Sequence, residues 1–398
     1  MAEIDKKYNI RPFIDPPLSN SDTEKVTLAA IDLSLFKEGD EYREQRKALA
    51  NQLEKSITTY GFFNLINFGI SNEEIEHIRA IAQSVLTLPD EVKLNYLASA
   101  ATKEQESSRS VGGERGQGFK PKGYWAIKNG VRDSIDHYNF RDTYLDSFTE
   151  RKNQHPEVVA HYLKDIAKYY NKIQREILPK ILRLCDLILE VPEGTIEKNY
   201  FPNLGTNSDD SASHGRFMMY HPYANQTKSN KTDSTFLRGH SDISAITFIT
   251  SQPILALQIK DYFDGGWKYV QHRQNSLIVN IGDAMEFISG GYFKAVLHRV
   301  IEPPEDQREF KRLVIIHFCN PSSSADLDPE NLKSPKLETL GHTKQDKLKN
   351  WEKIKFHHWN YVKGSLLGRS EAGDRNLLQF FGRTIERWHH FQGTSLSD

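Results

Sequence analysis

The spacing of hydrophobic residues divides the chain into helical stretches that flank a β-rich centre. Within Glu41–Thr59, Ala48, Leu53 and Ile57 share one helical face. From Arg216 to Phe318 the apolar runs are short, β-branched and aromatic, and Gly, Pro, Asn and Asp separate them. This pattern is typical of an all-β sandwich or barrel. Further helices are predicted over 71–88, 156–190 and 375–391, and strands over 26–34 and 62–68.

Composition narrows the classes of protein that this chain can belong to. The 398 residues are 38% hydrophobic and 26% charged, with a formal net charge of −1, so no global charge attracts nucleic acid or anionic membranes. The start MAEIDKKYNI lacks the apolar core of a signal peptide, and no apolar run approaches the roughly 20 residues of a membrane span. Cys185 and Cys319 lie in apolar segments and do not suggest a disulfide framework. We expect a cytoplasmic protein, or a nuclear one, with neither nucleic acid nor membrane as partner.

A histidine and a carboxylate interrupt the apolar segment RGHSDISAITF. Residues two apart on a strand share a face, so His240 and Asp242 would converge there. For this pair alone, a plain structural hydrogen bond is an adequate explanation. His298, late in another predicted strand, would join them if the two strands pair. Two histidines and one carboxylate suit non-haem Fe(II), because coordination positions stay open. Zinc takes the same residue types, although no motif supplies the general base of a zinc hydrolase.

A buried cation is predicted in the segment KRLVIIHF. Alternation places Arg312, Val314, Ile316 and Phe318 on one face of a strand. An inward guanidinium needs an anion, and its planar shape suits a carboxylate. The two alternatives are a bound ligand and a structural ion pair.

The motifs GHSDISAITFI, LALQIKD, GGWKYVQ, LIVNIGDAMEFISGG and AVLHRVI occur in an order that identifies a family. Over roughly residues 25–365 the chain resembles the Fe(II)- and 2-oxoglutarate-dependent dioxygenases, in the branch similar to isopenicillin N synthase. That resemblance implies a mainly β fold with flanking helices, built on a double-stranded β-helix (jelly roll). We accordingly expect an extended arm at 1–25, a mixed helical region at 26–200, the jelly-roll core at 201–322 and a helical extension at 323–398.

The resemblance also implies roles for particular residues. His240, Asp242 and His298 match the iron ligands of the family. Arg312 matches the arginine of its Arg-x-Ser motif for 2-oxoglutarate, whereas Val314 stands at the serine position. Arg308 lies nearer the usual spacing but in a polar loop, so we prefer Arg312. Tyr220 is the expected second donor to the co-substrate, with a register uncertainty of one that brings in His221, and core packing is its alternative role.

The expected activity follows from the same resemblance. With Fe(II), 2-oxoglutarate and O2, the enzyme would oxidise a small organic molecule, typically by hydroxylation, and release succinate and CO2. No catalytic residue beyond the metal centre is predicted. Two alternatives remain, because Val314 removes one donor to the co-substrate: an iron-dependent oxidase that does not use 2-oxoglutarate, and a non-catalytic binding relative.

The substrate pocket is less defined by the sequence. Aromatic residues of the N-terminal region, the last core strand and the C-terminal segment are its candidates, with plain core packing as the alternative. The polar, glycine-rich stretch 100–123 is a candidate lid, whose basic residues fit either an acidic substrate or a solvated face. The turn Asn280–Asp283 is expected to shape the barrel near the site. The pocket candidates are Phe119, Tyr124, Trp125, Phe318 and Phe381.

Overall fold

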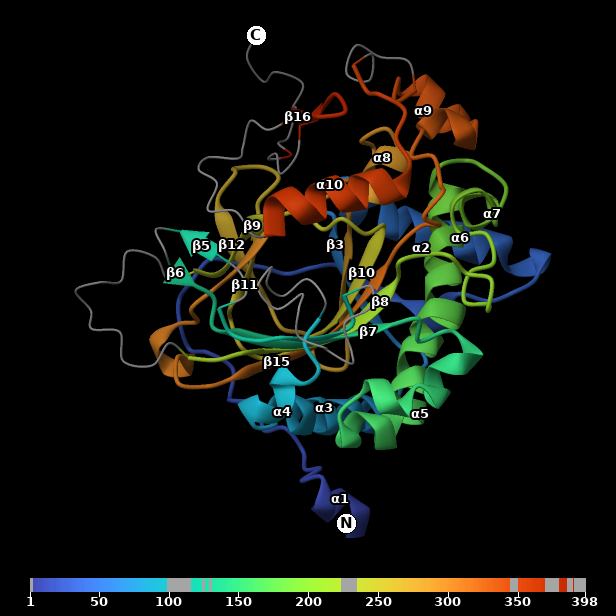
Figure 1. Ribbon diagram of the computed structural model, residues 1–398. Coiled ribbons are helices and arrows are strands. Elements are labelled where there is room, and N and C mark those ends of the chain that lie inside the picture. The colour runs from blue at the N-terminus through green and yellow to red at the C-terminus, as the bar shows by residue number, and fades with distance from the viewer. Residues whose placement is uncertain are drawn as a thin grey trace.

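Two β-sheets form the centre of the molecule in the computed structural model (Figure 1), which describes residues 3–98, 116–123, 126–128, 131–222, 235–343, 350–368, 379–384 and 389. The five-stranded sheet has the order β1-β12-β11-β14-β9, and the eight-stranded sheet has the order β2-β3-β13-β10-β15-β8-β7-β4. This is the predicted double-stranded β-helix with flanking helices. The smaller sheet contains β1 (Lys25–Val26), β12 (Trp267–Val270), β11 (Leu257–Lys260), β14 (His298–Ile301) and β9 (Thr235–His240). The larger contains β2 (Ala30–Asp32), β3 (Phe62–Ile66), β13 (Leu277–Ile281), β10 (Ile246–Thr250), β15 (Arg312–Cys319), β8 (His214–Tyr220), β7 (Ile135–Arg141) and β4 (Gly118–Lys120).

Helices cover the outer face of the larger sheet (Figure 1). The long helical stretch predicted over 156–190 is α5 and α6, joined by a π-helical turn at Ile173–Ile177. Ser71 begins α3 as predicted, and its side chain and that of Glu74 form a reciprocal capping box. The longer helices are α2 (Arg43–Ile57), α3 (Asn72–Leu86), α5 (Glu157–Lys172), α6 (Leu178–Ile188) and α10 (Phe356–Gly368). The shorter ones are α1 (Glu3–Lys7), α4 (Asp90–Leu94), α7 (Thr195–Tyr200), α8 (Asp283–Ile288) and α9 (Pro335–Thr339).

The larger sheet is buried on both faces, and alternation along its strands divides the core in two. On β15, Leu313 and Ile315 pack toward the helices, whereas Val314 and Ile316 pack between the sheets. Because successive side chains point to opposite faces, one apolar strand serves both layers. The space between the sheets is therefore reached only by alternate residues, Arg312 among them.

The N-terminal arm begins with the short helix α1 and is not extended throughout. Beyond α1, the arm packs on the core. Arg79 Nη2 of α3 donates to Asp15 Oδ1 at 2.7 Å, and Gln307 Nε2 donates to the carbonyl of Pro17 at 2.7 Å. The first residues therefore connect the helical layer to the β14–β15 connection.

The predicted helix over 375–391 is wrong for the described residues 379–384. Gln379–Phe380 and Arg383–Thr384 pair instead as the hairpin β16–β17. Its central residues Phe381 and Gly382 have φ of 51° and 72°, the left-handed values of a tight hairpin turn. A Cβ on Gly382 would lie 1.6 Å from the carbonyl oxygen of Asn350, so glycine is required there. The second small hairpin is β5 (Ala126–Lys128) with β6 (Val131–Arg132).

Among the described helices, none combines the length and the apolar character that crossing a membrane requires.

Candidate metal centre and co-substrate pocket

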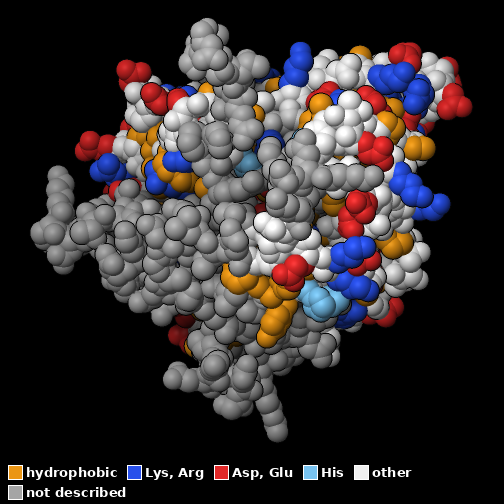
Figure 2. Space-filling model, turned by 90° about the horizontal axis from the view of Figure 1, so that it is seen from above, with side chains coloured by type: hydrophobic (Ala, Val, Ile, Leu, Met, Phe, Trp, Pro, Cys, Tyr) orange, Lys and Arg blue, Asp and Glu red, His pale blue; other side chains and the backbone are white. Residues whose placement is uncertain are grey.

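A cavity of about 250 Å³ lies between the two sheets. Alternate residues of β8 and β15 form much of its wall, and the C-terminal helix α10 contributes Asn360, Lys363 and Gly364. Figure 2 shows the molecule from the side on which α10 lies, and on the described part of that surface acidic and basic side chains are interspersed. No charge of a single sign dominates that described surface.

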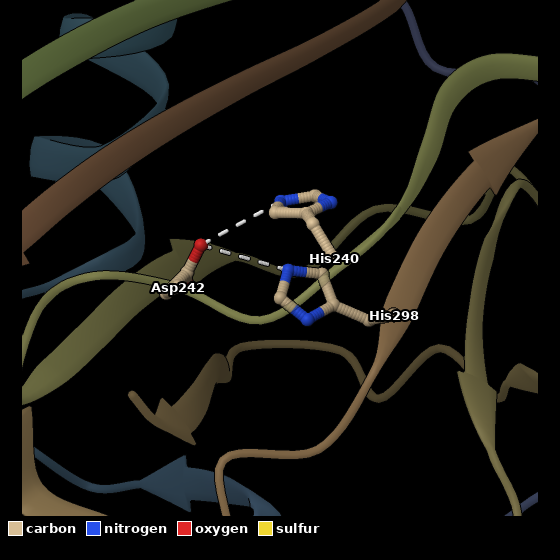
Figure 3. A group of neighbouring side chains, drawn as sticks. All are labelled: His240, Asp242 and His298. Carbon is tan, nitrogen blue, oxygen red and sulfur yellow. Dashed lines mark ion pairs between the residues drawn. The ribbon is translucent and has the colours of Figure 1, made fainter. Parts of the chain in front are cut away.

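His240, Asp242 and His298 converge at one wall of the cavity (Figure 3). The Nε2 atoms of His240 and His298 each lie 3.7 Å from Asp242 Oδ1, and the potential ligand atoms all lie within 4.8 Å of one another. Among the described residues, this is the one group of three or more His, Cys, Asp or Glu side chains with metal-binding spacing. The arrangement matches a facial 2-His-1-carboxylate site.

The structure brings these three residues together in a different way from the predicted one. His240 is the last residue of β9, and Asp242 lies in the turn beyond the strand rather than on its face. His298 is the first residue of β14 rather than a late one, and it pairs directly across the sheet with His240. The two imidazoles are thus cross-strand neighbours, with ring centroids 4.3 Å apart, and a turn brings the carboxylate to them.

Hydrogen bonds behind the triad leave one atom of each residue directed at a metal. Nδ1 of His240 is 2.9 Å from the carbonyl of Arg238, and Nδ1 of His298 is 3.1 Å from that of Val296. A carbonyl only accepts, so each Nδ1 carries the proton and each Nε2 presents a lone pair. Asp242 Oδ2 accepts from Thr247 at 2.7 Å and from Asn280 at 2.9 Å, which leaves Oδ1 for coordination. The donor set therefore fits a divalent iron ion.

Electrostatics favour the ligating forms of His240 and Asp242. Burial, and then the neighbouring His298, lower the pKa of His240 below its ordinary value. Burial alone would raise the pKa of Asp242, but the two imidazoles and the hydrogen bonds from Asn280 and Thr247 hold it below the ordinary value. A neutral imidazole and an ionised carboxylate are the forms that bind a metal.

The turn that carries Asp242 is packed against the start of α8. The backbone N–H of Gly282 donates to the carbonyl of Ala245 at 2.9 Å, and that of Asp283 donates to the carbonyl of Asp242 at 2.8 Å. A Cβ on Gly282 would lie 2.1 Å from the carbonyl oxygen of Ser244. The segment Asn280–Asp283 thus shapes the site through a close backbone contact with the turn that carries Asp242.

We expect Gly282→Ala to weaken metal binding about tenfold, because the Asp242 turn must move to admit the methyl group. Overpacking should also cost about 1–3 kcal/mol of folding stability. Metal titration and urea unfolding measure the two effects. Gly364→Ala is the matched control, since a Cβ there meets no atom within 4 Å. Equal metal affinity in the Gly282 variant and the wild type would contradict the expectation.

Arg312 is a buried cation in the wall of the cavity. The residue is 6% exposed, its Nε lacks a hydrogen-bond partner, and no described acidic residue forms an ion pair with it. Its guanidinium lies 4.9 Å from the ring centroid of Tyr220, its cross-strand partner on β8. Burial lowers the pKa of Arg312, as expected for a cation without a counter-charge. Two partners were predicted for Arg312, a bound ligand or an acidic side chain. The described residues do not provide the acidic side chain.

Of the residues proposed for the co-substrate, Tyr220 and Arg312 line the cavity. Tyr220 lines the cavity, whereas His221 is directed elsewhere and lies 3.0 Å from Asp136. Burial raises the pKa of Tyr220, so its hydroxyl stays protonated and can donate. Arg308 lies outside the cavity lining, its side chain is 45% exposed, and it pairs with Glu302 at 3.6 Å.

The five aromatic residues predicted for the substrate pocket do not all line the cavity. Phe318 lines the cavity and stacks on His214 with ring centroids 4.7 Å apart. Phe119 does not line it: the residue is fully buried on the helix side of β4, 4.6 Å from the ring of Tyr138. Phe381 does not line it either, because it forms the turn of the C-terminal hairpin. Tyr124 and Trp125 lie outside the described residues.

Several cavity residues were missed from the sequence. Alternation along β8 could have found His214 and Arg216, which share the face of Tyr220. Arg216 lies over the ring of Phe318 at 4.9 Å, and its Nε donates to Asn139 at 2.8 Å. Lys363 carried no sequence signal at all, because nothing in its neighbourhood predicts which strand loop α10 meets.

Comparison with known proteins agrees with this geometry. Residues 212–321 match the family model of the 2OG-Fe(II) oxygenase superfamily, and residues 28–158 match that of the N-terminal region of non-haem dioxygenases in morphine synthesis. A leucoanthocyanidin dioxygenase of Malus domestica is 25% identical over 80% of this chain and 79% of its own. The DMR6-LIKE OXYGENASE 1 protein of Arabidopsis thaliana is also 25% identical, over 80% of each chain.

Solved structures share the fold. A full-length Neurospora crassa protein in complex with alpha-KG superposes with a TM-score of 0.66 at 18% identity, over 88% of this chain and all of that one. JOX2 in complex with 2OG, Fe and JA gives a TM-score of 0.62 at 18% identity, over 91% of this chain and 93% of the other. The chain belongs to the 2OG-Fe(II) oxygenase superfamily.

Proposed function

We propose that this protein is a dioxygenase that uses Fe(II), 2-oxoglutarate and O2 to oxidise a small organic molecule, with hydroxylation as the expected outcome. The observation that carries the proposal is the pairing of two features in one cavity. One is a triad in which hydrogen bonds engage one polar atom of each residue and leave the other atom available to a metal. The other is an inward arginine without an acidic partner among the described residues.

The roles of the side chains follow from these contacts. His240, Asp242 and His298 would hold the iron, and Arg312 with the Tyr220 hydroxyl would bind the far carboxylate of 2-oxoglutarate. Iron and co-substrate together would supply the activation of O2, with succinate and CO2 as the co-products. The chain contributes orientation and exclusion of water: Ile249, Leu257 and Val300 are apolar lining residues of the same cavity.

The substrate would occupy the part of the cavity formed by His214, Arg216, Phe318 and α10. An aromatic wall next to a guanidinium suits a flat, polar small molecule. The names of relatives agree with such a class: leucoanthocyanidin dioxygenase and feruloyl CoA ortho-hydroxylase refer to reactions of aromatic small molecules.

Anaerobic addition of Fe(II) and then 2-oxoglutarate to the metal-free protein tests the proposal. We expect a weak visible charge-transfer band that needs both additions, and succinate once O2 is admitted. Iron binding without the band or succinate would favour the oxidase alternative. Failure to bind iron at all would contradict the proposed function.

Val314 offers a direct test of the missing serine hydroxyl. Val314→Thr keeps the side-chain shape and adds a hydroxyl on the cavity face next to Arg312. One added hydrogen bond is worth about 0.5–1.5 kcal/mol, so we expect the KM for 2-oxoglutarate to fall about two- to tenfold. Val314→Ala, which adds no donor, should not lower it. A KM that rises in the threonine variant would show that the co-substrate does not reach this position.

A further inference from the structure

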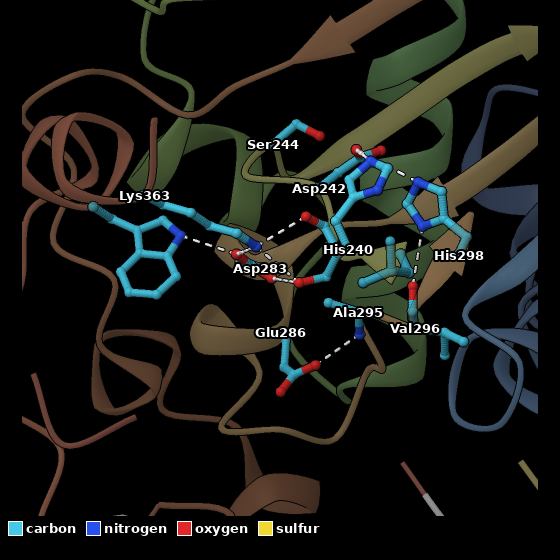
Figure 4. A network of polar contacts seen from close by, with 12 residues as sticks. His240, Asp242, Ser244, Asp283, Glu286, Ala295, Val296, His298 and Lys363 are labelled. Carbon is cyan, nitrogen blue, oxygen red and sulfur yellow. Dashed lines mark hydrogen bonds and ion pairs between the residues drawn. The ribbon is translucent and has the colours of Figure 1, made fainter. Parts of the chain in front are cut away.

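A buried lysine connects helix α10 to the turn between the two N-terminal metal ligands. Lys363 is 3% exposed, and its Nζ donates to the Ser241 carbonyl at 2.9 Å, to the Ser241 hydroxyl at 2.8 Å and to Asp283 Oδ2 (Figure 4). Ser241 Oγ donates in turn to Asp283 Oδ1 at 2.7 Å. The three side chains thus close a ring of hydrogen bonds behind the predicted metal site.

Asp283 is fixed from other sides as well. It is the first residue of α8, its backbone N–H donates to the Asp242 carbonyl at 2.8 Å, and Trp359 Nε1 donates to its Oδ2 at 3.1 Å. Trp359 itself is fully buried against Phe287, with ring centroids 4.8 Å apart. The ion pair therefore joins α8 and α10, two elements that hold the Asp242 turn between them.

The Ser241 carbonyl is the contact with a consequence for the metal. That oxygen belongs to the peptide unit whose nitrogen is the backbone nitrogen of Asp242, and the unit is planar. Holding the oxygen restrains this plane, which contains the Cα of Asp242. The Asp283 N–H, which donates to the Asp242 carbonyl, restrains the next peptide unit, so Asp242 is held from both sides. Thr247 and Asn280 then set the rotation of the carboxylate.

We propose that Lys363 is a positioning residue of the metal site, which holds the 241–242 peptide and so directs the Asp242 carboxylate at the metal. Helix α10 lies beyond residues 212–321 of the family match, and through Lys363 it would help to position a ligand of the metal centre. The inference rests on the proposed function, because it assumes that the metal binds at this triad.

Metal binding by the metal-free, full-length protein tests the inference without relying on turnover. We expect Lys363→Met to weaken binding of Mn(II), a redox-stable probe, by about 10–100-fold, as followed by electron paramagnetic resonance. Arg46→Met is the matched control: Arg46 is 2% exposed on α2, pairs with Glu193 and donates to two backbone carbonyls. The control should lose folding stability in urea but keep Mn(II) affinity.

A second variant covers the risk that a stranded Asp283 carboxylate unfolds the chain. Lys363→Met combined with Asp283→Asn removes both charges, an exchange that folded proteins often tolerate. We expect this variant to fold and still to bind Mn(II) weakly, because the Ser241 carbonyl has lost its donor. Wild-type affinity in either Lys363 variant would overturn the inference while leaving the proposed function intact. Absence of Mn(II) binding in the wild type would instead contradict the proposed function.

Discussion

Asp242→Ala is expected to lower Fe(II) affinity by more than about 100-fold, beyond the range usual for residues that only support a ligand. Asp242 is the one acidic member of the triad, and without it two neutral imidazoles face the metal. Thr247 and Asn280 also lose the carboxylate as acceptor and keep only Ser244 and the Ile281 carbonyl as partners of these groups. Anaerobic iron titration and succinate formation under air measure the loss.

A buried carboxylate elsewhere separates this effect from simple destabilisation. Asp186 on α6 is fully buried and accepts backbone N–H groups of Gly194 and Ile196 at 2.7 and 2.9 Å. Asp186→Asn should alter folding stability and leave iron affinity unchanged. Iron bound by the Asp242 variant as tightly as by the wild type would remove the triad from the mechanism.

The second large effect concerns the co-substrate. Arg312→Met should raise the dissociation constant of 2-oxoglutarate about 10- to 100-fold, since a hydrogen bond to a charged group is worth about 1.5–3 kcal/mol and each 1.4 kcal/mol is tenfold. Methionine retains much of the packing volume in a position that is 6% exposed. Iron binding should persist, because Arg312 is not among the ligands.

Arg308→Met is the matched control for this prediction. Arg308 is the other arginine near the expected spacing, and it lies at the surface beside Glu302. We expect no change in 2-oxoglutarate binding for this variant. If only the Arg308 variant weakens binding, the assignment of the co-substrate arginine has to be exchanged.

Strand periodicity made part of the site predictable. Arg312, Val314, Ile316 and Phe318 do share the cavity face, because period-two alternation depends only on the strand being regular. The helices α3 and α5–α6 were equally predictable, from helical spacing and the Ser71 cap.

Features that depend on strand ends and on tertiary packing were not predictable in the same way. Nothing local shows that β9 stops at His240, so the position of Asp242 in a turn could not be foreseen. The apolar residues around Phe381 have helical spacing, but the chain forms a hairpin there, in which Gly382 closely approaches the Asn350 carbonyl. That contact is non-local and leaves no signal in the spacing. Phe119 packs on the helix side of β4 because of its pairing with Tyr138, which is a non-local contact.

The place of α10 along the chain sets an order of events during synthesis. All three predicted ligands are translated before Phe356–Gly368, the helix that supplies Lys363. A nascent chain that already contains the ligands therefore lacks the contact to the Ser241 carbonyl. If Lys363 positions Asp242 as proposed, full metal affinity arises only after the C-terminal segment has left the ribosome and docked. A protein truncated before α10 would then bind iron more weakly than the full chain, even if its jelly roll had formed.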